Sequence, residues 1–275
     1  MATSSDQKAT PAIDADYRLS KRFQDKVCVI TGPSAHGIGG AVAMRLAEEG
    51  AAVALLGRDK PSELIDRLEA AEANVYWKDC DVTSSNQVLE ATKSCAQHFG
   101  TIDVLVNNAG IEVASSFEDM AEQQWQEVME VNLLGVLRVS QAMVSHLQKS
   151  KGVIVNISSA TAYAGTLGLA VYGASKAGVN GLTQSLAAEY ADRKIRVVGV
   201  APALVRTPMI APYVNNVTSA DWEQIQRCHP LGIGLPDDVA AAVAFLASAD
   251  ARWISGVTLP LGWMPAWNMP PLHQM

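Results

Sequence analysis

The stretch that decides the fold is VCVITGPSAHGIGGAVAMRLAEEGAAVALLGR, residues 27–58. It opens with the apolar run Val27–Ile30, passes through a glycine-rich turn and a helical pattern that includes Ala41–Glu49, and ends in a second apolar run, Ala52–Leu56. Continuous apolar runs of this length are typical of strands buried on both faces, as in a parallel sheet. The order predicts a strand, a helix and a second strand parallel to the first.

The same alternation continues along the chain. Further apolar runs occupy residues 75–77, 104–106, 152–157, 197–200 and 257–259, and Ala174–Tyr190 has a helical pattern. This order predicts an α/β fold, a doubly wound parallel sheet with helices on both faces and right-handed crossovers. A length of 275 residues fits one large domain or two small ones. Because no internal repeat or break in composition is visible, we expect a single domain over 25–275, preceded by a flexible N-terminal arm over 1–24.

Composition narrows the class of partner. Hydrophobic residues make up 49% of the chain, which provides ample material for a core, and the net charge is -7. An acidic chain repels phosphate backbones, so we expect no nucleic-acid partner. The first 25 residues lack the apolar segment of a signal peptide, and no apolar run approaches the length that spans a bilayer. We therefore expect no membrane partner.

The cysteines are far apart and form no CxxC pair or Cys/His cluster; they are Cys28, Cys80, Cys95 and Cys228. This spacing argues against a disulfide framework and against a zinc site. Free thiols in a reducing compartment are the simpler interpretation, and they indicate a cytoplasmic protein.

The glycine-rich turn, Thr31–Gly39, follows the first predicted strand and opens a helix. Glycines permit a tight turn and close approach of backbone to a pyrophosphate, and the helix N-terminus presents free N–H groups to it. The second strand ends in Gly57-Arg58, where sites that prefer NAD commonly have an acidic residue. The Arg58 guanidinium is suited to a 2′-phosphate. The alternatives are a turn that binds no nucleotide and a solvated surface arginine.

Tyr172 and Lys176 are four residues apart at the start of a predicted helix, so they face the same side. A free tyrosine has a pKa near 10 and is a poor acid–base group at neutral pH. A nearby ammonium favours the phenolate and lowers that pKa, which lets the pair exchange a proton with a carbonyl oxygen. By itself the spacing also occurs on ordinary helix surfaces.

Several further motifs occur along the chain, and their order is the one found in a known protein family. From about Lys26 to Val257 the chain resembles the classical short-chain dehydrogenase/reductase family, which has a Rossmann-type fold. The resemblance rests on Thr31–Gly39, Cys80–Thr83, Asn107–Gly110, Val131–Gly135, Asn156–Ser159, Tyr172–Lys176 and Pro202–Thr207.

The resemblance implies catalytic roles for Asn132, Ser159, Tyr172 and Lys176. Tyr172 would donate a proton to the carbonyl or accept one from the alcohol, and Lys176 would lower the Tyr172 pKa and hold the nicotinamide ribose. Ser159, favoured over Ser158 by the family spacing, would hydrogen-bond the oxygen where charge develops. Asn132 would hold a water in a proton relay from Lys176. No metal is required.

The resemblance also implies a cofactor site, in which Asp81 contacts the adenine and Val205 and Thr207 bind the carboxamide. The cofactor-binding residues are Gly32, His36, Gly37, Ile38, Gly39, Arg58, Asp81, Val82, Asn108, Ala109, Gly110, Tyr172, Lys176, Pro202, Val205 and Thr207. His36 lies where NADPH-preferring relatives often have a second basic residue. Together with Arg58 it leads us to expect NADP(H) as the preferred cofactor, with NAD(H) possible.

Three segments depart from the family pattern. The turn has four residues between its first two glycines where the family has three, and Pro202-Ala203 replaces the family's Pro-Gly. The end of the chain, from Leu261 onward, is rich in Pro, Met and Trp, and suits a pocket wall, a subunit contact or an ordinary packed tail. Residues 208–234, by contrast, match the family's variable substrate loop, and their side chains suit a fairly apolar carbonyl compound or a segment packed on itself.

The leading hypothesis is an NADPH-dependent oxidoreductase that reversibly reduces a ketone, aldehyde or 3-oxoacyl group. The alternatives are an NAD-dependent secondary-alcohol dehydrogenase and, in another class, a catalytically idle nucleotide-binding sensor or scaffold. The family's main subunit contact corresponds to Trp125–His146 and Ala174–Tyr190. We therefore expect a homotetramer or homodimer.

Overall fold

The sheet of the computed structural model, which describes residues 21–211 and 217–262, has seven parallel strands in the order β3-β2-β1-β4-β5-β6-β7. The strands are β1 (Val27–Thr31), β2 (Ala52–Gly57), β3 (Val75–Asp79), β4 (Val104–Asn107), β5 (Val153–Ile157), β6 (Arg196–Pro202) and β7 (Thr258–Leu261). The strand order reverses between β1 and β4, where the chain crosses from one half of the sheet to the other. This confirms the prediction of a single doubly wound Rossmann-type domain.

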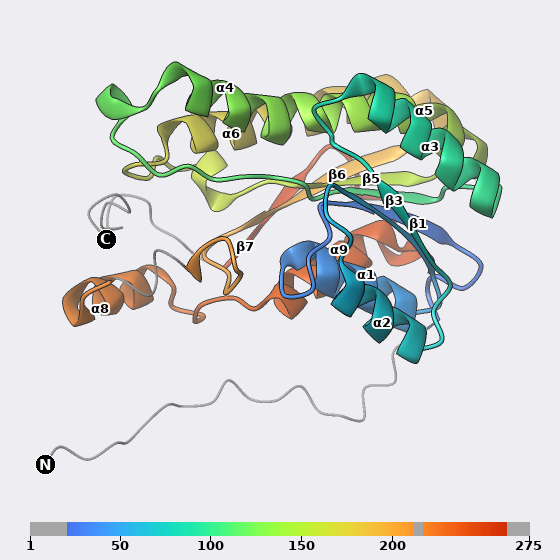
Figure 1. Ribbon diagram of the computed structural model, residues 1–275, viewed down its shortest axis with the longest axis horizontal. Helices are drawn as coiled ribbons and strands as arrows, with labels where there is room; N and C mark the ends of the chain where they lie inside the picture. The colour runs from blue at the N-terminus through green and yellow to red at the C-terminus, as the bar shows by residue number, and fades with distance from the viewer. Residues whose placement is uncertain (1–20, 212–216, 263–275) are drawn as a thin grey trace, which may run out of the picture.

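Helices cover both faces of the sheet (Figure 1). One face is covered by α1 (Ile38–Glu48), α2 (Ser62–Ala70) and α9 (Pro236–Ala247); the other by α3 (Ser85–Phe99), α4 (Glu122–Met129), α5 (Gly135–Ser150) and α6 (Ala170–Tyr190). A separate helix, α8 (Ser219–Cys228), lies beyond the carboxyl end of the sheet within the predicted substrate loop. None of the helices described is long and apolar enough to cross a membrane.

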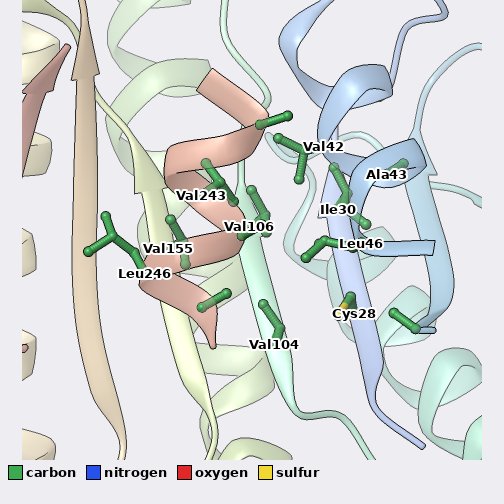
Figure 2. Packing of buried hydrophobic residues seen from close by; sticks show 14 of the residues in the cluster. Cys28, Ile30, Val42, Ala43, Leu46, Val104, Val106, Val155, Val243 and Leu246 are labelled. Carbon is green, nitrogen blue, oxygen red and sulfur yellow. The ribbon is translucent and has the colours of Figure 1, made fainter. Parts of the chain in front are cut away.

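Apolar side chains from the central strands and from α1 and α9 form one half of the core (Figure 2). Ile30, Val42, Leu46 and Val243 are all inaccessible to solvent. Complete burial of such a side chain contributes roughly 1.5–3 kcal/mol. The strands are therefore fixed by burial on both faces, and their carboxyl ends form a rigid edge on which loops are supported.

The N-terminal boundary lies earlier than predicted. Of the predicted flexible arm over 1–24, residues 1–20 lie outside the described residues, but Phe23 is 2% exposed and Arg22 pairs with the buried Glu49 at 2.6 Å. The folded part therefore includes residues before 25, because Phe23 belongs to the core. Residues 212–216 of the substrate loop and the tail from 263 lie outside the described residues. All four cysteines are buried and unpaired.

Candidate active site

A cavity of about 370 Å³ lies at the carboxyl ends of the strands, at the point where the strand order reverses. Most residues expected to bind cofactor or substrate line it. They are Gly32, Gly37, Ile38, Gly39, Arg58, Asp81, Val82, Asn108, Ala109, Gly110, Ser159, Tyr172, Lys176, Pro202, Val205 and Thr207. Two expected residues, His36 and Asn132, do not line it. Open doubly wound sheets bind their ligands at this place.

The glycine-rich turn is held against the loop after β4. Gly32 has a φ of +63°, and a Cβ there would lie 2.6 Å from the Ala109 Cα, so only glycine fits. Asn108 donates from Nδ2 to the carbonyls of Thr31 and Gly32 at 3.0 and 2.8 Å. Gly37, the N-cap of α1, has no side chain to occupy the helix N–H groups. Ile38 and Gly39, the first residues of α1, line the cavity, and a helix N-terminus at this place fits a pyrophosphate.

The four-residue segment between Gly32 and Gly37 is tied to α2. Arg67 donates to the Ala35 carbonyl at 3.2 Å, and His36 Nε2 lies 3.2 Å from a carboxylate oxygen of Glu63. The side chain of His36 thus points to α2, away from the cavity. Ser34, which the sequence did not single out, lines the cavity instead.

Arg58 and Asp81 line the part of the cavity where the resemblance expects the adenosine of the cofactor. The Arg58 side chain is exposed. Asp81 is oriented by Thr83, whose N–H and hydroxyl donate to one carboxylate oxygen at 2.9 and 2.8 Å. Gly57 lies between Pro33 and Trp77, and a Cβ there would be 3.2 Å from Pro33 Cδ.

Tyr172 and Lys176 lie in the first turns of α6, one helical turn apart, at the opposite end of the cavity. The Lys176 ammonium lies 5.7 Å from the centre of the Tyr172 ring and donates to the Ile157 carbonyl at 2.9 Å. Ser158 donates to the Lys176 carbonyl at 3.1 Å and is buried, whereas Ser159 hydrogen-bonds the Tyr172 phenol. This geometry places Ser159, and not Ser158, beside the phenol.

Burial dominates the electrostatics of the pair. It lowers the pKa of Lys176 to about 8, while the negative charge of Glu112 acts in the opposite direction. Burial, followed by the charge of Glu112, raises the pKa of Tyr172 above its ordinary value, and the hydrogen bond with Ser159 lowers it. The net direction for Tyr172 is opposite to the one expected from Lys176 alone. The phenol is therefore protonated at neutral pH and able to act as an acid.

Asn132 lies in a single wide π-helical turn, Glu130–Leu134, between α4 and α5. Its Oδ1 accepts from the Ile111 N–H at 2.8 Å, and its Nδ2 donates to the Ile111 carbonyl at 2.9 Å and to Ser175 Oγ at 3.2 Å. Ser175 in turn donates to the Tyr172 carbonyl at 2.7 Å. The Asn132 side chain thus fastens the loop after β4 to the start of α6.

The loop after β6 closes the cavity beside the pair. Pro202 ends the strand, Ala203 N–H donates to the Leu261 carbonyl at 2.8 Å, and Val205 bridges to Gly234. The buried His229 accepts from the Leu204 N–H at 3.2 Å. These contacts hold Val205 and Thr207 at the cavity wall, where the resemblance expects carboxamide binding.

Glu112 is, like Ser34, a residue of the site that the sequence did not single out. It lines the cavity two residues beyond the Asn107–Gly110 motif, and burial raises its pKa to about 7 against the favourable charge of Lys176. Its Oε1 is buried without a hydrogen-bond partner among the described residues. The only signal in the sequence was a carboxylate next to a recognised motif, in an irregular segment.

The chain has clear relatives. It matches the family model described as short chain dehydrogenase over residues 26–218. It is 38% identical over 239 residues to the 3-oxoacyl-(acyl-carrier-protein) reductase of Thermotoga maritima, covering 86% of this chain and 95% of that one. It is 40% identical over 247 residues to 3beta-hydroxysteroid dehydrogenase 1 of Eggerthella lenta, covering 86% and 92%.

Solved structures agree with these matches. A structure assigned as a short-chain dehydrogenase/reductase of Burkholderia xenovorans superposes with a TM-score of 0.83 at 31% identity, covering 88% of this chain and 96% of that one. The structural match covers 88% of this chain, which is more than the segment 26–218 of the family model. The chain therefore belongs to the short-chain dehydrogenase/reductase family of NAD(P)-dependent oxidoreductases.

Proposed function

We propose that this protein is an NADPH-dependent oxidoreductase that transfers a hydride reversibly between the nicotinamide and a carbonyl or secondary-alcohol substrate of the ketone or 3-oxoacyl type. One observation carries the proposal: a single cavity joins the glycine-rich turn and Arg58 at one end to Ser159, Tyr172 and Lys176 at the other. The relatives, named for a 3-oxoacyl thioester and a hydroxysteroid, support carbonyl and alcohol chemistry.

In the direction of reduction, the cofactor supplies the hydride when it is bound. Tyr172 then gives its phenolic proton to the substrate oxygen, and the Ser159 hydroxyl donates a hydrogen bond to the same oxygen. Lys176 holds the nicotinamide ribose through its ammonium. Asn132 positions Tyr172, because its side chain links the loop after β4 to the helix that carries Tyr172.

The preference for NADPH rests on Arg58, supported by the absence of a carboxylate at Gly57. The charge-assisted contact of a guanidinium with a 2′-phosphate contributes roughly 1.5–3 kcal/mol, or about ten- to a hundredfold in affinity. His36 contributes less than the sequence suggested, since it is paired with Glu63. That pairing is the observation that favours the alternative, an NAD-dependent secondary-alcohol dehydrogenase. An acidic residue at position 57 would reverse the preference, although its Cβ must displace Pro33 slightly.

A catalytically idle nucleotide-binding sensor is the alternative from another class. The complete set of Ser159, Tyr172 and Lys176 around one cavity argues against it. The test is a screen of ketones, aldehydes and secondary alcohols with NADPH/NADP and NADH/NAD, following the absorbance of the reduced nicotinamide. Turnover of at least one carbonyl compound, abolished in Tyr172→Phe, supports the proposal. Tight cofactor binding with no turnover of any compound identifies the sensor.

We propose in addition that the protein is a cytoplasmic homotetramer or homodimer. Trp125 on α4 and Leu137 on α5 expose 38% and 39% of their surface within the helices expected to form the subunit contact. The four unpaired cysteines are consistent with a reducing compartment. Light scattering at micromolar concentration tests the assembly, and a clean monomer contradicts it.

A further inference from the structure

One side of the cavity is built on a small apolar cluster that is separate from the larger clusters of the sheet. Ile225 and Cys228 of α8 are buried in it, and partly buried side chains pack around them: Leu204, Val217, Trp222 and Ile233. The helix itself lies beyond the carboxyl end of the sheet (Figure 1). Because so small a cluster buries little apolar surface, the position of α8 depends on the directional contacts that tie it to the rest of the fold.

His229, the C-cap residue of α8, makes such a contact through both nitrogens of its buried ring. Nδ1 lies 2.7 Å from the Ile225 carbonyl oxygen, which only accepts, so Nδ1 carries the proton. Nε2 lies 3.2 Å from the backbone nitrogen of Leu204, whose N–H only donates, so Nε2 carries no proton. The two partners therefore require a neutral imidazole in a single tautomer.

The two partners of His229 belong to different walls of the cavity. Leu204 directly precedes Val205, on the side where the resemblance expects the nicotinamide, whereas Ile225 lines the cavity from α8. The backbone extends the link, because the Leu204 carbonyl accepts from the Gly234 N–H at 3.0 Å. His229 itself does not line the cavity, so any effect on the reaction passes through these two partners.

We propose that His229 is a positioning residue: as a neutral imidazole it holds α8, the substrate wall, in place against the nicotinamide wall, and its protonation releases this contact. A protonated Nε2 would present a donor to the Leu204 N–H, which is itself a donor, and the hydrogen bond could not form. The inference rests on the proposed function only for the identity of the ligand that each wall contacts.

The surroundings of His229 favour the neutral ring. Burial lowers the pKa of His229 below its ordinary value of 6.5, and the bond to the Ile225 carbonyl acts in the opposite direction. The adjacent Cys228 thiol stays neutral, because burial raises its pKa. Of the charged side chains in the adjoining segments, Asp221 is bound by the Thr218 hydroxyl, and the others are exposed: Arg206, Glu223, Arg227, Asp237 and Asp238. As pH falls through 6.5, the released ring binds a proton that the held ring does not, so the contact is lost on the acid side.

The direct test is amide hydrogen exchange of residues 203–207 and 219–228 in the full chain, followed by mass spectrometry. His229→Gln keeps an acceptor for the Leu204 N–H and cannot be protonated, whereas His229→Phe fills the volume and removes both bonds. Near neutral pH we expect exchange in both segments to rise about tenfold in His229→Phe and to stay within about threefold of wild type in His229→Gln.

The pH dependence separates a positioning role from simple packing. At about pH 5.5, one unit below the ordinary pKa, wild-type exchange corrected for the intrinsic rate should rise by up to about tenfold, and exchange in His229→Gln should not. The same two substitutions at His98, an exposed histidine in the last turn of α3, are the matched controls and should leave both segments unchanged.

A kinetic arm uses ethyl acetoacetate as the probe. His229→Phe should raise its KM about tenfold and change kcat by less than about threefold, because the proton donor Tyr172 is untouched. An unchanged KM in a variant that turns over this ester overturns the effect on the substrate wall.

Three results of the exchange measurement overturn the proposal: equal exchange in wild type and His229→Phe, exchange in His229→Gln as fast as in His229→Phe, and corrected wild-type exchange that does not depend on pH. If His229→Phe does not fold, the comparison of wild type with His229→Gln across pH decides alone. If wild type reduces no carbonyl, the proposed function fails, and the exchange data still decide the role of His229.

Discussion

Replacing Glu112 by Gln should stabilise the protein in a manner that depends on pH. Burial raises the pKa of this carboxyl from 4.5 to about 7. Between these two values the folded protein retains a proton that the unfolded chain releases, so the stability contributed by the neutral carboxyl is lost as pH rises. Each pKa unit corresponds to about 1.4 kcal/mol, which gives a total cost of about 3 kcal/mol above neutral pH. The glutamine variant escapes this cost, since it has no proton to lose.

Urea denaturation of wild type and Glu112→Gln, at equal protein concentration, tests this. Near pH 8 the variant should have the larger free energy of unfolding by about 3 kcal/mol, and near pH 5 the difference should shrink to about 1 kcal/mol or less. The charged and titratable groups facing the carboxyl are Lys176 and Tyr172, and the attraction of Lys176 is already part of the raised pKa. The control Glu118→Gln, at an exposed carboxylate of the neighbouring segment Phe117–Asp119, should differ from wild type by less than about 0.5 kcal/mol at either pH. A difference between Glu112→Gln and wild type that is constant with pH would refute the reasoning, because it would mean that the carboxyl is hydrated or paired.

Three other substitutions test the site. Tyr172→Phe should reduce turnover at least about a hundredfold while nearly preserving cofactor affinity, since it removes only the acid; near-normal steady-state rates would refute its role. Arg58→Ala should weaken NADPH binding about tenfold or more and leave NADH nearly unchanged in fluorescence titrations; equal weakening of both would show that Arg58 does not contact the 2′-phosphate. Gly32→Ala should lower the free energy of unfolding by roughly 1–3 kcal/mol, because its Cβ would overlap Ala109. The control Gly165→Ala, with open space around it, should not, and equal stabilities in thermal unfolding would contradict the close packing.

The sequence was sufficient for the sheet and for the placement of Tyr172 beside Lys176 in α6. The runs that became β1 and β2 are apolar throughout, and burial on both faces leaves such a run few alternatives. Tyr172 and Lys176 needed only helical spacing to be placed together. Local patterns of this kind determine local geometry, so the strands and the placement of the two residues were predicted correctly.

The remaining features depend on contacts between distant segments. The His36 side chain does not line the cavity, because it contacts the carboxylate of Glu63 on the following helix. Glu112 lies in an irregular segment whose direction is set by the Asn132 side chain, 20 residues further on, through its two bonds to Ile111. No periodic pattern in the sequence indicates that Glu63 contacts His36 or that Asn132 binds Ile111. Phe23 is also buried, and no local pattern in the sequence predicted its burial.

The separation between the strand core and the loops at its carboxyl edge has a consequence for how such a chain can change over generations. Side chains such as Ile30 and Val243 are sealed within the core, whereas Glu112, Thr161 and Thr166 belong to connecting segments at the edge. Mutations in those segments can therefore accumulate with little loss of folding, and each one presents a different chemical surface to the same hydride and the same proton donor. Substitutions in these segments can therefore change the substrate range with little loss of folding, and a mutational library confined to these three positions would test this.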